Sequence, residues 1–246
     1  MTPARQGLRA SLASPEGKRV YVRQLFSTIA DRYDFITVLL SYGQDRRWKR
    51  RLVARARISA GTSALDLACG TGDITFAVAG EGARTIGLDI TPRMLQIARA
   101  KPAAILHPHA AFVAGDMMGL PFPSGRFDLV TTGYGLRNVP HLATAIAEIH
   151  RVLKPGGRLL SLDFNRPANA ALRALYLTYL TVVGSAVGFV LHRDPDTYRY
   201  IPESIRRYPG AAAVCELARR QGFASCEYLP VLGGLMAIHD ARKPPD

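Results

Sequence analysis

Residues 64–73, ALDLACGTGD, join a hydrophobic run to a glycine-rich turn and then to the start of a helical pattern. This order predicts a buried strand, a turn in which the backbone approaches a ligand closely, and a helix whose first N–H groups are free. Doubly wound α/β folds bind nucleotide-like cofactors at such a turn. The third glycine of the dinucleotide fingerprint is replaced by Thr75, which weakens a dehydrogenase interpretation.

Short β runs and helical segments alternate on both sides of this turn. We expect strands near residues 63–67, 84–88, 111–114, 127–132 and 158–163, and helices near residues 73–80, 91–100 and 141–153. A helix near 210–221 and β runs near 226–230 and 234–239 follow, and the two runs can pair as an antiparallel edge. The predicted fold is α/β, with a doubly wound, mostly parallel sheet.

The 246 residues fit one α/β domain with N-terminal helices and a helical lid insertion. We divide the chain into a flexible N-terminus (1–18), a helical extension (19–60), a cofactor-binding core (61–165), a lid (166–208) and a C-terminal helix with edge strands (209–246). Residues 174–191 carry no charge, and about 17 residues is the lower limit for a membrane span. A span leaving the middle of the domain would break the sheet's connectivity, so we expect a lid helix that meets a greasy ligand or the bilayer surface.

A formal net charge of +13 indicates an anionic partner, which composition alone leaves open between nucleic acid, a membrane surface and a phosphorylated substrate. A basic run consists of Arg46, Arg47, Lys49, Arg50, Arg51, Arg55 and Arg57. It is either a solvated helix face or a surface that docks on anionic lipid. An RNA-binding role is the alternative, but only Trp48 is interleaved for base stacking.

The N-terminus and the cysteines give little sign of export or of a metal site. Arg5 and Arg9 precede no apolar run that could serve in a signal peptide, and Pro3, Gly7 and Pro15 interrupt an amphipathic transit helix. Cys69, Cys215 and Cys226 lack the paired spacing of a zinc or redox site. We expect three buried thiols in a reducing compartment and no metal.

Three acids follow or lie within the predicted strands where a cofactor would bind. Asp89 ends the second strand about twenty residues after the glycine turn, where a carboxylate accepts ribose hydroxyls; the alternative role is a cap for the next helix. Asp116 follows the third strand and could accept the adenine amino group, or it is a solvated turn residue. Asp66 would lie beside a positive amino group. Together they indicate a cationic, adenosine-bearing ligand, S-adenosylmethionine.

From about residue 20 to 240 the chain resembles the menaquinone/ubiquinone-biosynthesis C-methyltransferases, a family that methylates demethylmenaquinol and polyprenyl benzoquinols. The shared motifs are 26–34 (FSTIADRYD), 65–73, 120–123 (LPFP), 127–128, 135–139 (GLRNV), 151–158 (RVLKPGGR), 198–205 (YRYIPESI), 233–234 and 237–239. The resemblance implies the class I S-adenosylmethionine-dependent methyltransferase fold. With the residue-based argument it gives these expected cofactor-binding residues: Asp66, Gly70, Thr71, Gly72, Asp89, Ile90, Asp116, Met117 and Gly133.

The chain departs from the family pattern at three positions near the expected acceptor site. Thr37 stands where the family usually has Asn, Asp45 where it commonly has His, and Gly133 where it usually has Ser. These changes leave the cofactor motif intact and concern the identity of the quinol.

The resemblance also implies an acceptor quinol whose hydroxyl has a pKa near 10, as for tyrosine, so its ionisation needs a base or a fixed positive charge. Arg137 can supply that charge, and a water held by Arg137 and Asn138 can accept the proton, because a guanidinium stays protonated. Tyr33 could hydrogen-bond the ring oxygen. The alternative for Arg137 is a structural ion pair, and His141, His192 and His239 are rival bases.

We therefore expect an S-adenosylmethionine-dependent C-methyltransferase that acts on a polyprenyl quinol, most simply demethylmenaquinol. Another polyprenyl benzoquinol or lipophilic small molecule is the nearer alternative, an RNA methyltransferase the more remote one, and a non-catalytic membrane adaptor the non-enzymatic one. The expected location is the cytoplasm with peripheral membrane contact and no nucleic acid partner, and a homodimer is possible.

Overall fold

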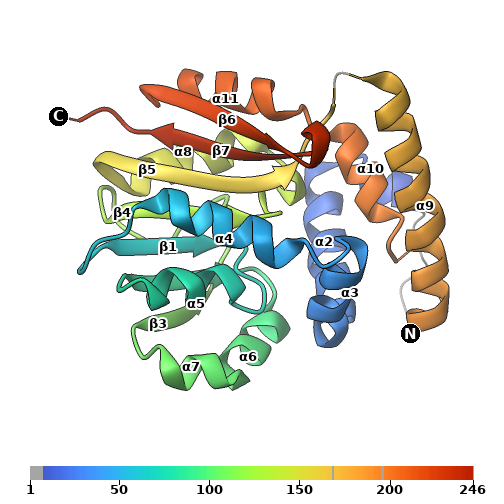
Figure 1. Cartoon of the computed structure of the whole chain (residues 1–246), viewed down its shortest axis with the longest axis horizontal. Helices are drawn as coiled ribbons and strands as arrows, with labels where there is room; N and C mark the ends of the chain where they lie inside the picture. The colour runs from blue at the N-terminus through green and yellow to red at the C-terminus, as the bar shows by residue number, and fades with distance from the viewer. Residues whose placement is uncertain (1–7, 168, 195–196, 246) are drawn as a thin grey trace.

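The computed structural model describes residues 8–167, 169–194 and 197–245, which form one seven-stranded sheet with helices on both faces (Figure 1). The strands are β1 (Ser63–Leu67), β2 (Arg84–Asp89), β3 (Ala110–Ala114), β4 (Phe127–Gly133), β5 (Leu153–Phe164), β6 (Ser225–Val231) and β7 (Met236–Arg242). Their order is β3-β2-β1-β4-β5-β7-β6, in which β1 to β5 pair in parallel and β7 is antiparallel to both neighbours. The predicted fold class and its antiparallel edge are confirmed.

Two helical layers bury the sheet. The helices are α1 (Leu8–Ser11), α2 (Pro15–Ile29), α3 (Tyr33–Leu40), α4 (Asp45–Ala56), α5 (Asp73–Gly80), α6 (Pro92–Ala100), α7 (Pro102–Leu106), α8 (Leu142–Val152), α9 (Ala170–His192), α10 (Tyr200–Arg207) and α11 (Ala211–Arg220). Helices α4 and α5 pack on one face, where Leu129 of β4 belongs to their core cluster. Helices α8 and α11 pack on the other face with the next residue, Val130. Adjacent strand residues point to opposite faces, so a buried parallel strand is apolar throughout.

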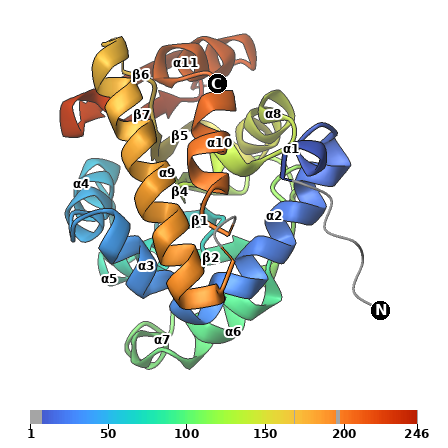
Figure 2. The ribbon, with the colours of Figure 1, turned by 90° about the vertical axis from the view of Figure 1, so that its right-hand side faces the viewer.

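The helices α2, α3, α9 and α10 gather at the carboxyl ends of the parallel strands and form a cap over that edge (Figures 1 and 2). Ile29 and Ile36 from the N-terminal helices share one core cluster with Tyr198, which precedes α10. The helical extension and the lid, which are far apart in the sequence, thus build one structure. Helix α9 has the length and the mean hydropathy, 1.8, of a membrane-crossing helix. Only 17% of its most apolar window is buried in the protein, whereas the core helix of a soluble protein would be mostly buried.

The chain becomes helical earlier than the sequence indicates. The expectation of a flexible segment over residues 1–18 is wrong for residues 8–18, since α1 and the first turns of α2 lie there. Ser14 caps α2 by accepting a hydrogen bond from the Gly17 N–H at 3.1 Å, and Leu12 is buried against Val22 and Tyr200. Residues 1–7, which include Pro3, Arg5 and Gly7, lie outside the described residues.

Two further local expectations change. Helix α8 ends at Val152 as the Lys-Pro-Gly-Gly sequence predicts, but residues 154–157 form a bulge within a longer β5 and not a separate turn, with Gly156 at φ +72°.

The prediction of three thiols is wrong for two cysteines: Cys215 of α11 and Cys226 of β6 form a disulfide, since α11 packs on β6 and brings their Cα atoms to 5.1 Å. Cys69 is free and buried.

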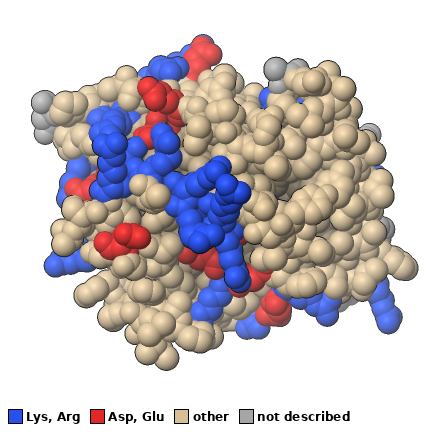
Figure 3. Space-filling view, in the orientation of Figure 1, with Lys and Arg blue, Asp and Glu red and all other residues tan. Residues whose placement is uncertain are grey.

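The basic run of the sequence, apart from Arg57 just after its end, lies on α4. Figure 3 shows Lys and Arg side chains gathered over this helix beside the uncharged face of the cap. Arg46, Arg47, Arg50 and Arg51 are exposed there. Lys49 is different, because its side chain is only 11% exposed and points to the sheet side of the helix. It therefore does not belong to the solvated basic face.

Candidate active site

The glycine turn after β1 has a backbone that side chains rarely permit. Ala68, Gly70 and Gly72 all have positive φ angles, of +49°, +55° and +88°. A Cβ on Gly72 would lie 2.8 Å from the Phe76 ring and 3.0 Å from the Phe112 ring, so a larger residue would have to displace both. This turn brings the Gly70 backbone to the edge of a cavity and leads directly into α5.

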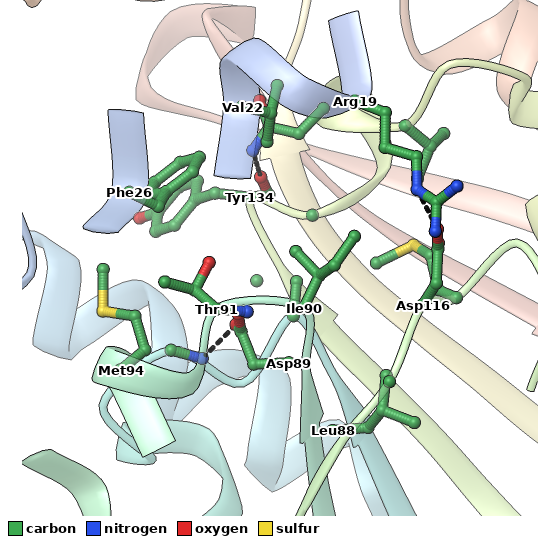
Figure 4. Close-up of a pocket in the computed structure, with 18 of the residues that line it drawn as sticks. Arg19, Val22, Phe26, Leu88, Asp89, Ile90, Thr91, Met94, Asp116 and Tyr134 are labelled. Atoms are coloured by element: carbon green, nitrogen blue, oxygen red, sulfur yellow. Dashed lines mark hydrogen bonds and ion pairs between the residues drawn. The ribbon is translucent and has the colours of Figure 1, made fainter. Parts of the chain in front are cut away.

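Asp89 connects the glycine turn with the end of β2. Its carboxylate accepts the Gly70 N–H at 2.9 Å and the Thr91 N–H at 2.8 Å, and it is 7% exposed. Burial raises the pKa of Asp89, and the backbone N–H groups oppose this shift. The N-cap residue of α6 is Thr91, so Asp89 does not cap the helix and instead fixes the turn that leads into it. Figure 4 shows the Asp89 side chain at the wall of the cavity, beside Ile90 and Met94.

The cavity has an open volume of about 710 Å³ and extends from the glycine turn to the ends of β3 and β4. Six of the nine expected cofactor-binding residues line it: Gly70, Asp89, Ile90, Asp116, Met117 and Gly133. Its roof comes from α2, through Arg19, Val22 and Phe26. At the far end, Asp116 accepts the Met118 N–H at 2.9 Å and pairs with Arg19 Nε at 3.0 Å (Figure 4). The sequence did not identify Arg19 or Val22 as part of the site, because no local pattern places these two residues at the ends of the strands.

The three remaining cofactor candidates lie beneath or beside the turn. Asp66 is 1% exposed and accepts hydrogen bonds from Thr75 Oγ1 at 2.7 Å and Thr131 Oγ1 at 2.9 Å. Burial raises the pKa of Asp66 to about 7 despite these bonds. Thr71 donates to Asp34 Oδ1 at 2.5 Å, and both Asp66 and Thr71 line a smaller polar pocket. Gly72 shapes the turn but lines neither this pocket nor the cavity.

A second, apolar cavity with an open volume of about 870 Å³ lies under the helical cap. Its walls come mainly from α2, α3, α9 and α10, with contributions from α4, β5 and the segment before α10. They include Leu25, Ile29, Ile36, Leu40, Trp48, Phe164, Tyr176, Leu180, Tyr198 and Ile201. Phe26, Tyr33 and Tyr134 line both cavities and separate one from the other. Burial raises the pKa of Tyr33, although Lys49 acts against this, so its hydroxyl is protonated and can donate a hydrogen bond.

Arg137 lies in the short 3-10 helix Leu136–Asn138 (η2) after β4, and it lines the apolar cavity. Its Nε is 3.3 Å from Asp163 Oδ1, its backbone N–H donates to Asp163 Oδ2, and its guanidinium lies 4.8 Å from the Phe164 ring centre. Nη1 donates to Asn138 Oδ1 at 3.1 Å and to Ser204 Oγ at 2.9 Å. The ion pair that the sequence left as the alternative is therefore present, and the same side chain faces the second cavity.

Asn138 has its amide held on both sides. Its Nδ2 donates to the Tyr134 carbonyl at 2.8 Å, and its Oδ1 accepts from Tyr200 at 2.9 Å as well as from Arg137. Arg137 and Asn138, which we expect to hold a water between the acceptor and the protein, are also hydrogen-bonded to each other directly. Asn138 lines the first cavity and Arg137 the second, so this contact crosses the boundary between them.

The three rival histidines line neither of the two large cavities. His239 is buried, and burial lowers its pKa to about 4. The His192 ring contacts the Tyr198 hydroxyl at 2.9 Å, and His141 precedes α8 as its N-cap residue. None of them is placed to act as the base.

The strand order, the glycine turn with Asp89 beyond it, and the cavity at the carboxyl ends of the strands define a class I S-adenosylmethionine-dependent methyltransferase. Residues 14–243 match the ubiE/COQ5 methyltransferase family, and the chain belongs to that family. It is 40% identical over 222 residues to the demethylmenaquinone methyltransferase of Thermus thermophilus, covering 89% of this chain and all of that protein.

Two further similarities agree with this assignment. The chain is 37% identical over 226 residues to the ubiquinone/menaquinone biosynthesis C-methyltransferase UbiE of a Marinomonas species, covering 90% of each chain. Among solved structures, it is similar to a methyltransferase from Thermotoga maritima described as a possible histamine N-methyltransferase, with a TM-score of 0.64 over 90% of this chain and 99% of that one. At 16% sequence identity, this last similarity concerns the fold alone.

Replacing Asp89 should weaken cofactor binding. We expect Asp89→Ala to lower the affinity for S-adenosylmethionine at least tenfold, because a charged hydrogen-bond acceptor to the ribose is worth about 1.5–3 kcal/mol. Isothermal titration measures the affinity, and thermal melts establish that the variant is folded. Asp128→Ala, at the opposite end of the sheet, is the matched control and should bind normally. Unchanged affinity in a folded Asp89→Ala protein would remove Asp89 from the site.

Proposed function

We propose that this protein transfers the methyl group of S-adenosylmethionine to a ring carbon of a polyprenyl quinol, with demethylmenaquinol as the substrate. The observation that supports this most is the apolar cavity next to the cofactor cavity, since Phe26, Tyr33 and Tyr134 line both of them. The names of the relatives agree, since they include demethylmenaquinone methyltransferases.

The second cavity suits a ring with a hydrocarbon tail. Its walls are mainly aliphatic and aromatic, while Arg137, Tyr33 and Tyr176 supply a few polar groups. Ligand sites of this kind orient an apolar molecule through a small number of polar contacts. The quinol ring would lie toward Tyr33 and Arg137, and the tail would extend between α3 and α9.

S-adenosylmethionine supplies an electrophilic methyl group, so the protein has to align the ring and make it electron-rich. The Arg137 guanidinium stabilises negative charge as the quinol hydroxyl gives its proton to water, and Asp163 fixes the orientation of that guanidinium. Tyr33 donates a hydrogen bond to a ring oxygen. When S-adenosylmethionine is bound, the ring carbon would form its new bond to the methyl group, the sulfur would keep the electron pair of the broken carbon–sulfur bond, and the ring proton would leave to water.

Arg137 should affect turnover far more than cofactor affinity, because it meets charge that develops on the quinol oxygen. We expect Arg137→Lys to reduce single-turnover methylation of a short-tailed demethylmenaquinol at least tenfold, since lysine keeps the charge but loses the planar fork. The cofactor affinity should stay near that of the unchanged protein.

Controls are needed because Arg137 also neutralises buried Asp163, and removing one member of such a pair costs about 3–5 kcal/mol. Arg137→Met combined with Asp163→Asn removes both charges and should be folded but inactive, as melts and activity will tell. A turnover rate equal to that of the wild-type protein in a folded Arg137 variant would refute the catalytic role of Arg137. If the protein methylated a polyprenyl benzoquinol or RNA, and did not methylate demethylmenaquinol, that molecule would replace demethylmenaquinol as the proposed substrate.

We also propose that the protein works in the cytoplasm at a membrane surface, where its substrate resides. Large apolar side chains are exposed on the two neighbouring helices of the cap, α3 and α9, and on the turn after α3: Phe35, Val38, Leu39, Tyr42, Leu175, Val182, Phe189 and Val190. We call this set the apolar face. The exposed arginines of α4 lie next to it (Figures 1 and 3). Monomeric soluble proteins rarely expose so many apolar residues together.

Vesicle binding tests this arrangement. We expect co-sedimentation with anionic phosphatidylglycerol vesicles to exceed that with neutral phosphatidylcholine vesicles, and added salt to reduce the difference. Val182→Glu with Phe189→Glu should reduce binding to both kinds of vesicle. Ile105→Glu, on the distant and exposed helix α7, is the control and should bind normally. Equal binding of all three proteins would contradict the docking role of the apolar face.

A further inference from the structure

A small polar pocket lies beside the glycine turn, and no function has yet been given to the charged groups that line it. It has an open volume of about 300 Å³, and its polar lining residues are Tyr33, Lys49, Asp66, Thr71, Asp73 and Tyr134. It adjoins the cofactor cavity, because Tyr33, Ala68, Gly133 and Tyr134 line both. With adenosine held near Asp89 and Asp116, the amino-acid end of the cofactor would lie toward the glycine turn and this pocket.

Lys49 is the cation that lines the pocket. Its Nζ is 2.7 Å from Asp45 Oδ2 and 3.0 Å from Asp73 Oδ2, and its side chain is 11% exposed. Burial opposes its charge, but the carboxylates of Asp73 and Asp45 outweigh burial and raise the pKa of Lys49. A protonated lysine has three N–H donors, and the two carboxylates occupy two of them. The third is available to a ligand in the pocket.

The charges around Lys49 complement the charges of the cofactor. Lys101 pairs with Asp73 at 3.0 Å and with Asp34 at 2.8 Å, which joins three carboxylates and two ammonium groups in one network. S-adenosylmethionine has two cationic groups and one carboxylate. The network has one negative charge in excess, which matches the net positive charge of the ligand, while Lys49 provides a local partner for the ligand's carboxylate.

We propose that Lys49 binds the carboxylate of S-adenosylmethionine through its third N–H group. This rests on the assignment of the cofactor site and does not involve the methyl acceptor. A purely structural role, in which Lys49 only fastens α4 to the start of α5, predicts something different. Loss of a structural ion pair would change the affinity for every ligand of the site by a similar factor, whereas loss of a carboxylate contact affects only ligands that have a carboxylate.

Decarboxylated S-adenosylmethionine distinguishes the two roles, because it lacks only the group in question. The measured quantity is the ratio of the affinity for S-adenosylmethionine to the affinity for the decarboxylated analogue, obtained by isothermal titration. We expect Lys49→Met to lower this ratio at least tenfold. Lys101→Met is the matched control: it removes an ammonium from the same network, but Lys101 does not line the pocket, so the affinity ratio should stay unchanged. Lys49→Arg should preserve most of the ratio.

The Lys49→Met variant should fold, because Asp45 still accepts the Tyr134 hydroxyl and Asp73 still pairs with Lys101. If melts show otherwise, the same ratio is measured in the double variant Asp45→Asn, Lys49→Met, which removes one charge of each sign. An unchanged ratio in a folded Lys49 variant would overturn the proposal. Failure of the unmodified protein to bind either ligand would refute the cofactor site itself, and failure to methylate a quinol would leave the Lys49 result unaffected.

Discussion

The site depends on one hydrogen bond between neighbouring strands, from the Gly70 N–H to the Asp89 carboxylate at 2.9 Å. It joins the turn after β1, whose positive φ angles need glycine, to the end of β2. The carboxyl ends of parallel strands meet at one edge of the sheet, so fixing these two ends also fixes the floor of the cofactor cavity. The helical cap can then close over that edge without adding a second domain.

Tyr134, like Tyr33, lines the cofactor cavity, the apolar cavity and the polar pocket. Its φ of +61° is uncommon for a residue with a side chain, and such strain persists only where the surroundings fix it. Here the backbone N–H donates to Leu162, the carbonyl accepts from Asn138, and the hydroxyl donates to Asp45 at 2.7 Å. Asp45 thus has a structural role, because its carboxylate contacts both Tyr134 and Lys49.

The sequence predicted well whatever depends on local pattern. The strands, the glycine turn, Asp89 and the residues at the strand ends were identifiable because periodicity and spacing place them on one edge of a parallel sheet. Contacts between distant segments could not be identified from the sequence. Lys49 looked like part of a basic helix face, and only the packing of α4 against α5 turns it toward Asp73. The same holds for the Arg19 roof, the Arg137 pair with Asp163, and the disulfide between α11 and β6.

The central claim is that the quinone ring enters the apolar cavity behind Tyr33 and Tyr134, and the chain's single tryptophan makes this measurable. Trp48 is buried and lines that cavity, and quinones quench tryptophan emission at short range. Titration of the protein with a short-tailed demethylmenaquinone should quench Trp48 fluorescence saturably, over the same concentrations at which the reduced form is methylated. Methylation of the quinol while Trp48 emission stays unchanged across the titration would contradict this account and place the acceptor outside the cavity.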